Sequence, residues 1–522
     1  MGENCLSGKN NGNKGSGTEA YRELEGYLEQ AMAFQTALIL LEWDNETLAP
    51  EAAGGNTARV QGTLSAAYQK ALTEPKAAEL IGRCQDEIQK DGDGQAYTEA
   101  QRAVVREAAE ELRQLSCIPP EEYRAYQELV SESARIWAKA RAQGDFEAFA
   151  PTLKKIVDYQ KKFAGYRARN GQKLYDVMLD TYEKGFGMKE LDEFFGILKA
   201  ELVPFLRKVM ESPVRIPDDF LTGNYSEEDQ RKLAEYLAEY VGFDFSRGVL
   251  AVSAHPFTTA LHNRDVRITT HYKEQMDSSL FSVIHEAGHG IYEMGIDDSL
   301  TQTLAGQGAS MGMHESQSRF FENIIGRSEA FWVPLYGKVK ELFPEQLKGV
   351  GREMFVKAIN RVEPGLIRTE ADELTYSLHV LVRYELEKLL IEEDLDVEQL
   401  PGLWADKYEA YLGVRPENET EGVLQDIHWA QGSFGYFPSY ALGSAFGAQM
   451  YFHMRKVLDF DGALESGHIE EIREYLREHI HRFGKLKTSK ELLKDMTGED
   501  FDPKYYVKYL KEKYGRLYQI EN

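Results

Sequence analysis

Residues 277–295 read DSSLFSVIHEAGHGIYEMG and decide the expected fold class. Apolar side chains in this stretch recur at the three- and four-residue spacing of one face of an α-helix. They are Leu280, Val283, Ile284 and Ala287. Asp277 is suited to cap the first turn, and Gly295 is suited to end the helix. The stretch therefore predicts an amphipathic helix.

The flanking sequence extends the helical pattern. Helical periodicity covers residues 18–112 and 120–241, with breaks that contain glycine or proline. Two strand signals stand out, at residues 248–253 and 265–272, and the second alternates in polarity. We therefore expect a mainly α protein, a multi-helix body with a small antiparallel β-sheet next to the helix at 277–295.

The overall charge limits the classes of partner. The chain of 522 residues carries 61 basic and 86 acidic side chains, a formal net charge of −25. Such a charge repels nucleic-acid phosphates and anionic membrane surfaces, so neither partner is expected. No apolar run is of membrane-spanning or signal-peptide length, and Cys5, Cys84 and Cys117 match no disulfide or metal spacing. We predict a cytoplasmic protein with free thiols.

The distribution of residue types suggests how the chain is organised. Residues 1–17 are rich in Gly, Asn, Lys and Ser, and we expect them to be a disordered tail. Residues 18–522 are expected to form a single domain, with 18–240 as a helical scaffold half and 241–522 as a catalytic half. Histidine supports this division, because 8 of the 12 histidines lie in the window 255–428 and none precedes it.

The predicted helix contains the motif His285-Glu286-Ala287-Gly288-His289. Histidines four residues apart project from one helix face, so His285 and His289 can bind one metal ion. Glu286 can accept a proton from a metal-bound water, whose pKa the metal lowers. A chance match would leave a non-enzymatic helical scaffold, but the helical context and the histidine-rich window favour a hydrolase site.

The third metal ligand must come from outside this motif. The extended pattern with a third histidine is absent, because Tyr292 and Gly295 occupy the relevant positions. Glu315, at the start of a later predicted helix, is one candidate. Glu293 is a nearer rival, but it lies about two turns along the same helix as His285 and would struggle to complete a tetrahedral site.

Several motifs resemble the carboxypeptidase Taq family of metallocarboxypeptidases, peptidase family M32. The resemblance extends over most of the chain from about residue 18 onward. It rests on Trp43-Asp44 with Pro50, Gly55 and Arg59, His255-Pro256-Phe257, Asp265-Val266-Arg267-Ile268-Thr269, the motif at 285–289, His314-Glu315-Ser316-Gln317, Ile367-Arg368-Thr369-Glu370-Ala371-Asp372-Glu373, and residues 422–443 with Gln425-Asp426-Ile427-His428-Trp429.

The resemblance implies a zinc-dependent carboxypeptidase that removes single residues from peptide C-termini. It also implies an almost all-helical fold around a deep active-site groove, and a homodimer. By motif, the metal ligands would be His285, His289 and Glu315, and the general base Glu286. Two alternatives stay open: the donor set can also hold cobalt or manganese, and a helical zinc endopeptidase or oligopeptidase would use the same chemistry.

A carboxypeptidase must bind a free terminal carboxylate, and a guanidinium group is the fitting partner. The resemblance favours Arg368 for this role. The alternative is a surface salt bridge between Arg368 and Glu370 or Asp372. Arg267 is a weaker candidate for substrate binding.

Other residues are expected to support the site. Arg319, one turn after Glu315, is expected to orient that ligand. Asp372 is a candidate to accept hydrogen bonds from the free ring nitrogens of the metal histidines, although a solvated helix-face charge is the ordinary alternative. The family motif suggests a place for His255 in the substrate groove.

The segment 432–443 is rich in glycine and aromatic residues, which suits a loop whose backbone approaches a ligand closely. Tyr436 or Tyr440, together with His428, could donate hydrogen bonds to the oxyanion of the tetrahedral intermediate. The alternative is an aromatic core cluster. The sequence does not distinguish between the two tyrosines.

The strand predicted at 265–272 directly precedes the motif helix. An exposed strand can add a peptide to its sheet by main-chain hydrogen bonds. We therefore hypothesise that this strand presents the substrate to the metal. Burial of Thr269 and Thr270 away from the metal would contradict the hypothesis.

Overall fold

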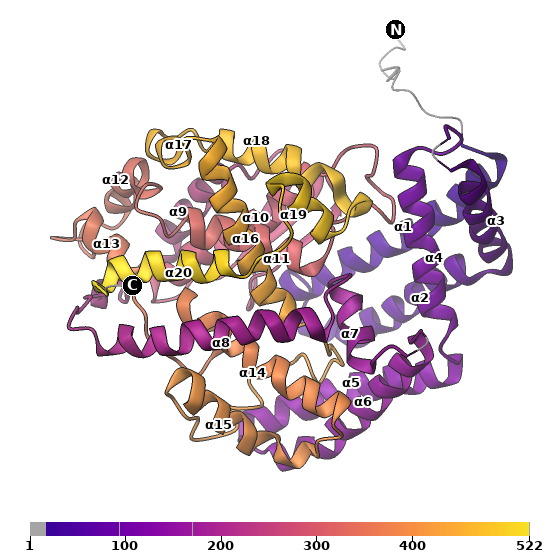
Figure 1. Cartoon of the computed structure of the whole chain (residues 1–522), viewed down its shortest axis with the longest axis horizontal. Coiled ribbons are helices and arrows are strands. Elements are labelled where there is room, and N and C mark those ends of the chain that lie inside the picture. The colour runs from indigo at the N-terminus through magenta and orange to yellow at the C-terminus, as the bar shows by residue number, and fades with distance from the viewer. Residues whose placement is uncertain (1–16, 93, 170, 521–522) are drawn as a thin grey trace, which may run out of the picture.

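The computed structural model describes residues 17–520 apart from 93 and 170, so Cys5 and the predicted tail up to residue 16 lie outside the described residues. The described chain is mainly helical, as the sequence predicts (Figure 1). The helices of the first half are α1 (Glu19–Thr47), α2 (Gly54–Thr73), α3 (Pro75–Asp91), α4 (Glu99–Ser116), α5 (Pro120–Gln143), α6 (Phe146–Arg167), α7 (Leu174–Tyr182), α8 (Met188–Glu211) and α9 (Glu227–Val241).

The second half begins with three short strands and continues as helices. The strands are β1 (Gly248–Val252), β2 (Thr258–His262) and β3 (Asp265–Thr270). The helices are α10 (Met276–Gly295), α11 (Met311–Arg319), α12 (Trp332–Leu342), α13 (Arg352–Ala358), α14 (Glu373–Glu392), α15 (Leu400–Leu412), α16 (Pro438–Val457), α17 (Phe460–Ser466), α18 (Ile469–His479), α19 (Ser489–Thr497) and α20 (Lys504–Tyr518). A π-helical segment, Phe320–Ile325, follows α11 directly.

The ends of α10 show how far local signals predict helix boundaries. Gly295 is the last residue of α10, as predicted. The predicted N-cap is wrong, because Gln275 occupies that position and Asp277 lies in the first turn. A carboxylate in the first turn is still favourable, since the helix dipole leaves partial positive charge there. The helix and its last residue were therefore predictable from the sequence, whereas its first residue lies one position before the predicted cap.

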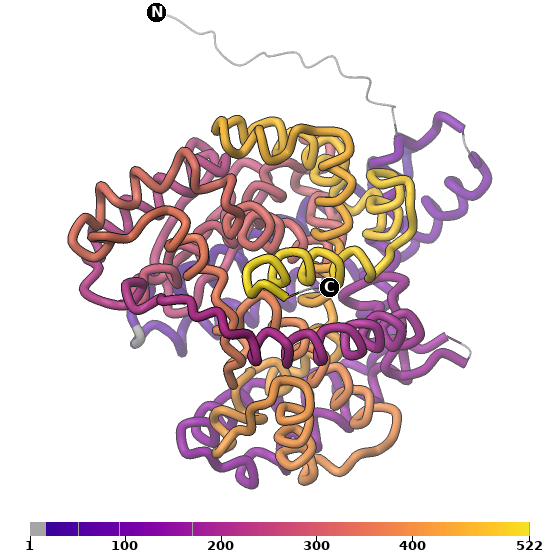
Figure 2. The backbone as a smooth tube through the Cα atoms, turned by 60° about the vertical axis from the view of Figure 1, so that its left-hand side comes forward, coloured from indigo at the N-terminus to yellow at the C-terminus, as the bar shows by residue number. Residues whose placement is uncertain are grey.

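Two hydrophobic cores hold the described helices together. The smaller core joins α1, α3 and α4 to the chain after α10, through side chains such as Leu28, Val105 and Leu300. The larger core fills the rest of the body. Within that body α8 lies alongside α20 in both views and also contacts α14 (Figures 1 and 2). The two halves of the chain therefore share both cores, and the division at residue 240 stays a prediction.

The small sheet is mixed, with the strand order β1-β3-β2. β2 pairs with β3 in antiparallel fashion, but β1 pairs with β3 in parallel, which corrects the expected antiparallel sheet. The sequence signals indicated β1 and β3 and missed β2, whose residues TTALH lack regular polarity alternation. β3 is therefore the central strand, with a neighbour on each side.

The hypothesis that residues 265–272 add a peptide strand is wrong. Both edges of β3 are already paired, so β3 has no open row of backbone donors and acceptors. Thr269 and Thr270 are fully buried, and the Thr269 hydroxyl contacts Ser253 and Phe257 within the sheet. The sequence alone could not show this, because β3 is covered by strands from two other segments of the chain, β1 and β2.

Two glycines let α11 pack very closely against its neighbours. A Cβ atom on Gly288 of α10 would lie 2.8 Å from Ser318 Cα and 2.9 Å from Gln317 O. A Cβ atom on Gly443 of α16 would lie 2.7 Å from both Cβ and Cγ of Glu315. Side chains at these positions would overlap the α11 backbone or Glu315 itself. α11 is therefore held between α10 and α16 at a distance that only glycine permits.

None of the helices in the described part of the chain combines the length and apolar character needed to cross a bilayer. Cys84 and Cys117 are free thiols, as predicted. Cys84 is buried in the smaller core, and Cys117 is partly buried.

Substituting Gly443 tests the close packing of α16 on α11. We expect Gly443→Ala to lower the free energy of unfolding by about 1–3 kcal/mol, because the new methyl group overlaps Glu315 and forces a backbone shift. Gly447→Ala, one turn along the same helix, is the matched control, since its Cβ would meet Ile324 Cδ1 at an ordinary 3.5 Å. Urea unfolding followed by circular dichroism measures both. Equal stabilities of the two variants would contradict the packing argument.

His481 predicts a dependence of stability on pH. His481 is fully buried, and burial, followed by the nearby Arg477, lowers its pKa from 6.5 to about 3. Between these values the unfolded chain binds one more proton than the folded chain. The free energy of unfolding should therefore fall as the pH drops from 6.5 towards 3, by up to about 1.4 kcal/mol per pH unit.

Urea unfolding between pH 7.5 and 4.5, with a chelator present throughout, measures this slope. His481→Gln, which does not titrate, should reduce the slope by about one proton. His468→Gln, which replaces an exposed histidine, is the control. An unchanged slope in His481→Gln would show that His481 does not contribute.

Candidate metal centre and active site

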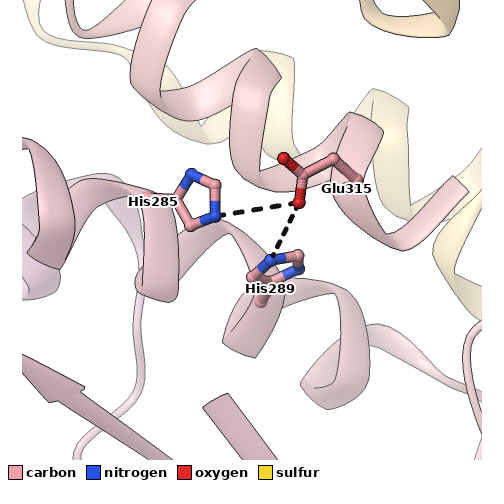
Figure 3. Close-up of side chains that lie close together, drawn as sticks. All are labelled: His285, His289 and Glu315. Atoms are coloured by element: carbon pink, nitrogen blue, oxygen red, sulfur yellow. Dashed lines mark ion pairs between the residues drawn. The ribbon is translucent and has the colours of Figure 1, made fainter. Parts of the chain in front are cut away.

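Three side chains from two helices meet at one point. His285 and His289 project from the same face of α10, and Glu315 projects towards them from α11 (Figure 3). Glu315 Oε2 lies 3.8 Å from His285 Nε2 and 3.6 Å from His289 Nε2. One donor atom from each of the three residues lies within 4.8 Å of the others. The structure thus brings together the ligand set that the sequence predicts.

The spacing of these donors fits a divalent metal ion. Metal–ligand distances of about 2.0–2.1 Å in a tetrahedral zinc site put neighbouring donors roughly 3.3 Å apart. The distances from Glu315 Oε2 to the two histidine nitrogens, 3.8 and 3.6 Å, exceed this only slightly. Two imidazoles and one carboxylate are also a donor set that zinc accepts in catalytic sites, with the fourth position left for water or substrate. The residues present therefore fit a catalytic metal.

Glu293, the nearer rival as third ligand, points elsewhere. Its Oε1 accepts hydrogen bonds from His314 Nε2 at 2.8 Å and from Gly308 N at 3.2 Å. Position along α10 explains the difference, because Glu293 lies beyond the turn that carries His289. Among the described residues, the group suited to hold a metal is His285, His289 and Glu315.

Glu322 orients His285. Its Oε2 accepts a hydrogen bond from His285 Nδ1 at 2.8 Å, which leaves Nε2 facing Glu315. Burial disfavours the charged carboxylate, but Arg319 and the His285 hydrogen bond hold the pKa of Glu322 well below its ordinary value. Glu322 lies in the π-helical segment after α11, a geometry found often at functional sites.

The role predicted for Asp372 is wrong. Asp372 caps α14, and its Oδ1 accepts hydrogen bonds from the backbone N–H groups of Leu374 and Thr375. Burial raises the pKa of Asp372 to about 6, against the effect of these hydrogen bonds. Glu322 occupies the position beside the histidine that the sequence analysis gave to Asp372. The Asp372 carboxylate is therefore engaged in capping α14 and is not available to orient a histidine.

His289 is oriented by a second histidine. His289 Nδ1 lies 2.6 Å from His314 Nδ1, and His314 Nε2 lies 2.8 Å from Glu293 Oε1. With Nε2 of His289 turned to the ligand cluster, Nδ1–H of His289 donates to His314, and Nε2–H of His314 donates to Glu293. Burial, followed by His314 and His285, lowers the pKa of His289 well below its ordinary value. Both histidines of the candidate metal site thus have a defined tautomer.

Arg319 contacts Glu315, as expected. Its Nε donates to Glu315 Oε1 at 2.8 Å, so Oε2 remains directed at the histidines. Its guanidinium also lies 4.0 Å from the centre of the Tyr376 ring and 3.1 Å from Glu322. Arg319 therefore contacts both Glu315, a candidate ligand, and Glu322, which orients His285.

Glu286 lies beside the cluster and is buried. The hydroxyl of Thr258, the first residue of β2, donates to Glu286 Oε2 at 2.6 Å. Burial raises the pKa of Glu286, while His285 and the Thr258 hydrogen bond oppose the rise. A carboxylate in this environment takes up a proton more readily than one in water.

Arg368 is buried, and it does not form the surface salt bridge with Glu370 or Asp372 that was the alternative. Its Nη2 and Nε donate to Asp426 Oδ1 at 2.8 and 3.1 Å, and its Nη1 donates to the Tyr376 hydroxyl at 3.2 Å. Asp426 also binds Arg383, whose Nε lies 2.7 Å from Asp426 Oδ2.

This cluster carries an excess of positive charge. Arg368 and Arg383 are two buried cations that share the single carboxylate of Asp426. Burial alone would raise the pKa of Asp426, but the two guanidinium groups hold it far below its ordinary value. A buried positive charge without its own counterion favours binding of an anion.

The aromatic segment lies against this positive cluster. The prediction of a loop over 432–443 is correct only as far as Phe437, because α16 begins at Pro438 and contains Tyr440. The Tyr440 ring is 4.7 Å from the Arg368 guanidinium, and the Tyr440 hydroxyl is 3.1 Å from His428 Nε2. The Tyr436 ring packs 5.2 Å from Tyr440. Burial lowers the pKa of His428 to about 4, so His428 is neutral near pH 7, and its Nδ1 is buried without a partner among the described residues.

Tyr376 links this region to the ligand cluster. Its hydroxyl accepts a hydrogen bond from Arg368 Nη1 at 3.2 Å, and its ring lies 4.0 Å from the guanidinium of Arg319, which binds Glu315. Burial raises the pKa values of Tyr436 and Tyr440, and the negative charge of Glu315 adds to the rise at both residues. The two tyrosines, His428 and Arg368 therefore lie together near the candidate metal ligands. Whether they bind substrate stays a prediction.

Two predicted substrate residues lie apart from this cluster. Arg267 pairs with Asp265 through two hydrogen bonds of 2.8 and 2.9 Å, and its guanidinium covers the Trp43 ring. These contacts give Arg267 a role in joining α1 to the sheet. His255 is exposed in the turn between β1 and β2.

A groove adjoins the ligand cluster, as the resemblance implies. A cavity of about 750 Å³ lies between the N-terminal helices and the second half of the chain. Its lining includes Gln35 and Glu107 from α1 and α4, Thr258 and Ala260 from β2, and His314 from α11. Thr258 contacts Glu286 and His314 contacts His289, so the cavity leads directly to the candidate site.

Sequence reasoning missed four contributors: Glu322, His314, Thr258 and Asp426. Glu322 could have been found, because it lies seven residues after Glu315 and hence two turns along the same side of a helix. His314 directly precedes a predicted ligand. Thr258 carried no local signal, because its partner Glu286 lies 28 residues away in the sequence. Asp426 stands in the motif at 425–429, but nothing local indicates its pairing with Arg383, 43 residues earlier.

Comparisons with known proteins identify the family of this chain. A family model described as Carboxypeptidase Taq (M32) metallopeptidase matches residues 23–514. Carboxypeptidase 1 of Bacillus subtilis is 40% identical over 501 residues, which cover 96% of this chain and 99% of that protein. Thermostable carboxypeptidase 1 of Pyrococcus furiosus is 36% identical over 501 residues, which cover 95% of this chain and 98% of that protein.

Solved structures show the same fold. The crystal structure of the M32 carboxypeptidase from Deinococcus radiodurans R1 matches with a TM-score of 0.91 and 34% identity, covering 96% of this chain and 100% of that chain. A Pyrococcus furiosus carboxypeptidase structure matches with a TM-score of 0.91 and 36% identity over the same shares. The chain therefore belongs to the carboxypeptidase Taq (M32) family of metallopeptidases, and it is a metallocarboxypeptidase that hydrolyses peptide bonds.

Proposed function

We propose that this metallocarboxypeptidase uses zinc, held by His285, His289 and Glu315, and releases single residues from peptides with a free C-terminal carboxylate. The convergence of these three side chains from α10 and α11 carries the proposal. When bound, zinc would polarise the scissile carbonyl and increase the acidity of the attacking water. Cobalt and manganese remain alternatives for the metal, and elemental analysis of the purified protein distinguishes them.

Glu286 is proposed as the general base. It lies next to His285 in the motif, is buried, and is held by the Thr258 hydroxyl at 2.6 Å. Its raised pKa favours uptake of the proton that the attacking water loses. The protonated carboxyl group can then give this proton to the amine of the leaving residue. No covalent bond between enzyme and substrate is needed.

Arg368 is proposed to bind the terminal carboxylate of the substrate. The excess positive charge of Arg368 and Arg383 over Asp426 provides the electrostatic attraction. The Tyr440 hydroxyl and His428, which lie against Arg368, are proposed to donate hydrogen bonds to the substrate or to the developing oxyanion, with Tyr436 beside them. This arrangement would restrict cleavage to the C-terminal peptide bond, because only the last residue of a peptide carries a free main-chain carboxylate.

The family assignment disfavours the two rival functions. A non-enzymatic scaffold would not explain a complete ligand set with oriented histidines. An endopeptidase would not need an uncompensated positive charge beside the metal ligands. A homodimer and a cytoplasmic location stay predictions, and sedimentation analysis tests the first of them.

Glu286→Gln tests the base. The amide keeps the shape of the side chain but cannot accept the proton, so kcat should fall about a thousand-fold while zinc binding is retained. Steady-state hydrolysis of a free-acid peptide and zinc stoichiometry measure the two effects. Glu274→Gln is the control and should retain activity, because Glu274 is exposed and lies just before α10, outside the motif. Near-normal turnover in Glu286→Gln would refute the assignment.

Arg368→Ala tests recognition of the terminal carboxylate. The wild-type enzyme should hydrolyse a free-acid peptide far faster than its amidated twin. Loss of a charge-assisted pair should lower kcat/KM for the free acid by about 10- to 150-fold and largely remove this preference. Product masses from both peptides measure it. Arg264→Ala, which removes an exposed arginine paired with Asp298, is the control. Equal losses on both peptides would indicate a purely structural role.

A further inference from the structure

Residues 429–435 form a series of turns between two residues that the proposed function places beside the substrate. His428 directly precedes this segment, and Tyr436 directly follows it. Within the segment, Ser433 N donates to the His428 carbonyl at 2.9 Å. Because these turns lie outside the helices and strands, contacts with neighbouring elements must fix the orientation of His428 and Tyr436.

Glu387 of α14 holds both ends of this segment. Its Oε1 accepts a hydrogen bond from Trp429 Nε1 at 2.8 Å, and its Oε2 accepts one from Gly435 N at 2.8 Å. The Tyr175 hydroxyl of α7 donates to the same Oε2 at 2.7 Å. One carboxylate thus binds the first and the last residue of the 429–435 segment and ties them to α7.

Close packing on α7 restrains the segment further. Gly435 has a φ of +87°, and a Cβ atom on it would lie 2.8 Å from the carbonyl carbon of Met178 in α7. The next residue, Tyr436, packs edge to face on Tyr182 at the end of α7, with 5.0 Å between the ring centres. Any side chain larger than glycine at position 435 would push the segment away from α7. The hydrogen bonds to Glu387 therefore act on a segment that already lies against the α7 backbone.

The environment of Glu387 makes its carboxylate costly to bury. Glu387 is fully buried, and its three hydrogen-bond partners are neutral groups. Burial raises the pKa of Glu387 to about 7, although the hydrogen bonds and the charge of Arg383 oppose the rise. By contrast, Asp426 is paired with two arginines. An apolar side chain would fill this space without the cost of a buried carboxylate, so the presence of Glu387 indicates that its acceptor atoms are needed.

We propose that Glu387 is a positioning residue for catalysis: its carboxylate fixes the 429–435 segment so that His428 and Tyr436 are directed at the substrate. This inference rests on the proposed function, which gives His428 and Tyr436 their place beside the substrate. Glu387 is fully buried, so it acts through the two ends of the segment rather than by contact with the substrate.

The inference predicts a loss in turnover rather than in substrate binding. Hydrogen-bond donors to an oxyanion contribute mainly in the transition state, so displacing His428 or Tyr436 should lower kcat more than it raises KM. Arg368, proposed to bind the terminal carboxylate, is held by Asp426 rather than by Glu387. The preference for a free C-terminal carboxylate should therefore survive removal of Glu387.

Glu387→Gln tests this in the metal-loaded enzyme. The amide replaces one acceptor oxygen by a donor, so it cannot accept from both Trp429 and Gly435. We expect kcat for a free-acid peptide to fall about 10- to 100-fold and KM to change about three-fold or less. The amidated twin of the peptide measures the carboxylate preference, which should be retained. An unchanged kcat in the folded, metal-loaded variant would overturn the proposal.

Glu385→Gln is the matched control on the same helix. Glu385 accepts a hydrogen bond from Tyr411 at 2.7 Å, the same distance that joins Tyr175 to Glu387, but its other partners are lysines rather than the segment. This variant should keep kcat within about two-fold of the wild-type value. An equal fall in both variants would indicate a general effect of changing a carboxylate on α14 and would overturn the proposal.

A second background shows whether Glu387 acts through the residues that flank the segment. In His428→Gln/Tyr436→Phe, the side chains that Glu387 is proposed to position are already altered. Glu387→Gln should then lower kcat by a further three-fold at most, roughly, because the effects of residues that act as one unit are not additive. A fall as large as in the otherwise wild-type enzyme would show that Glu387 acts elsewhere.

Trp429→Phe is a second variant for the case that Glu387→Gln does not fold. It removes the indole N–H group that Glu387 binds, while the smaller ring can still pack on Phe434. We expect kcat to fall about three- to ten-fold, and this fall to disappear in the His428→Gln/Tyr436→Phe background. An unchanged kcat in Trp429→Phe, or a fall that persists in that background, would contradict the proposal.

The indole N–H signal of Trp429 in NMR spectra reports the contact directly. The chain has five tryptophans, and the signal that Trp429→Phe removes is that of Trp429. At about pH 8.5, where the carboxylate is ionised, Glu387→Gln should move this signal upfield, because a charge-assisted hydrogen bond is lost. Glu385→Gln should leave it in place. An unmoved signal in Glu387→Gln would contradict the contact on which the inference rests.

The outcomes separate this inference from the proposed function. If the wild-type enzyme does not release single C-terminal residues, or if His428→Gln/Tyr436→Phe retains full kcat, the proposed function fails. If both tests support the proposed function, but the changes at Glu387 and Trp429 leave kcat unaltered or act independently of His428 and Tyr436, the inference about Glu387 alone is wrong. Circular dichroism and metal content identify a folding defect in Glu387→Gln, in which case Trp429→Phe decides the result.

Discussion

The close packing of α11 between α10 and α16 is the constraint on which the candidate site depends. Gly288 and Gly443 leave no room for a side chain at either contact. This approach places Glu315 within 4 Å of both motif histidines. A larger separation would leave two histidines without a third ligand. The glycine inside the motif is therefore a packing requirement as well as a spacer.

The same helix carries the charges that organise the site. Glu315, Arg319 and Glu322 follow one another at helical spacing on α11 and the π-helical segment after it. Arg319 binds both carboxylates, and Glu322 in turn orients His285. Removal of any member would leave a buried charge without its partner, which is costly in a low-dielectric interior. Glu315, Arg319 and Glu322 thus form one connected group, in which the arginine balances the charge of the two carboxylates.

A region of positive charge lies beside the candidate metal ligands. Arg368 and Arg383 exceed Asp426 in charge, a setting suited to a carboxylate. Tyr376 joins this region to the ligand cluster, because its hydroxyl accepts a hydrogen bond from Arg368 and its ring lies 4.0 Å from the Arg319 guanidinium. A carboxylate-binding region so close to the ligands is consistent with removal of residues from a chain end.

Spacings of a few residues within one helix were enough to predict the helical class, the α10 helix and the two histidines with Glu286. The resemblance to the family indicated Glu315, which lies beside both histidines in the structure. The carboxylates that orient the histidines could be identified only from how the helices pack. Asp372 and Glu322 both lie on helices, but capping engages the first, and packing against α10 engages the second. Likewise, strand signals could not show that β3 is central and β2 is the open edge, because strand order depends on pairing between segments that the sequence separates.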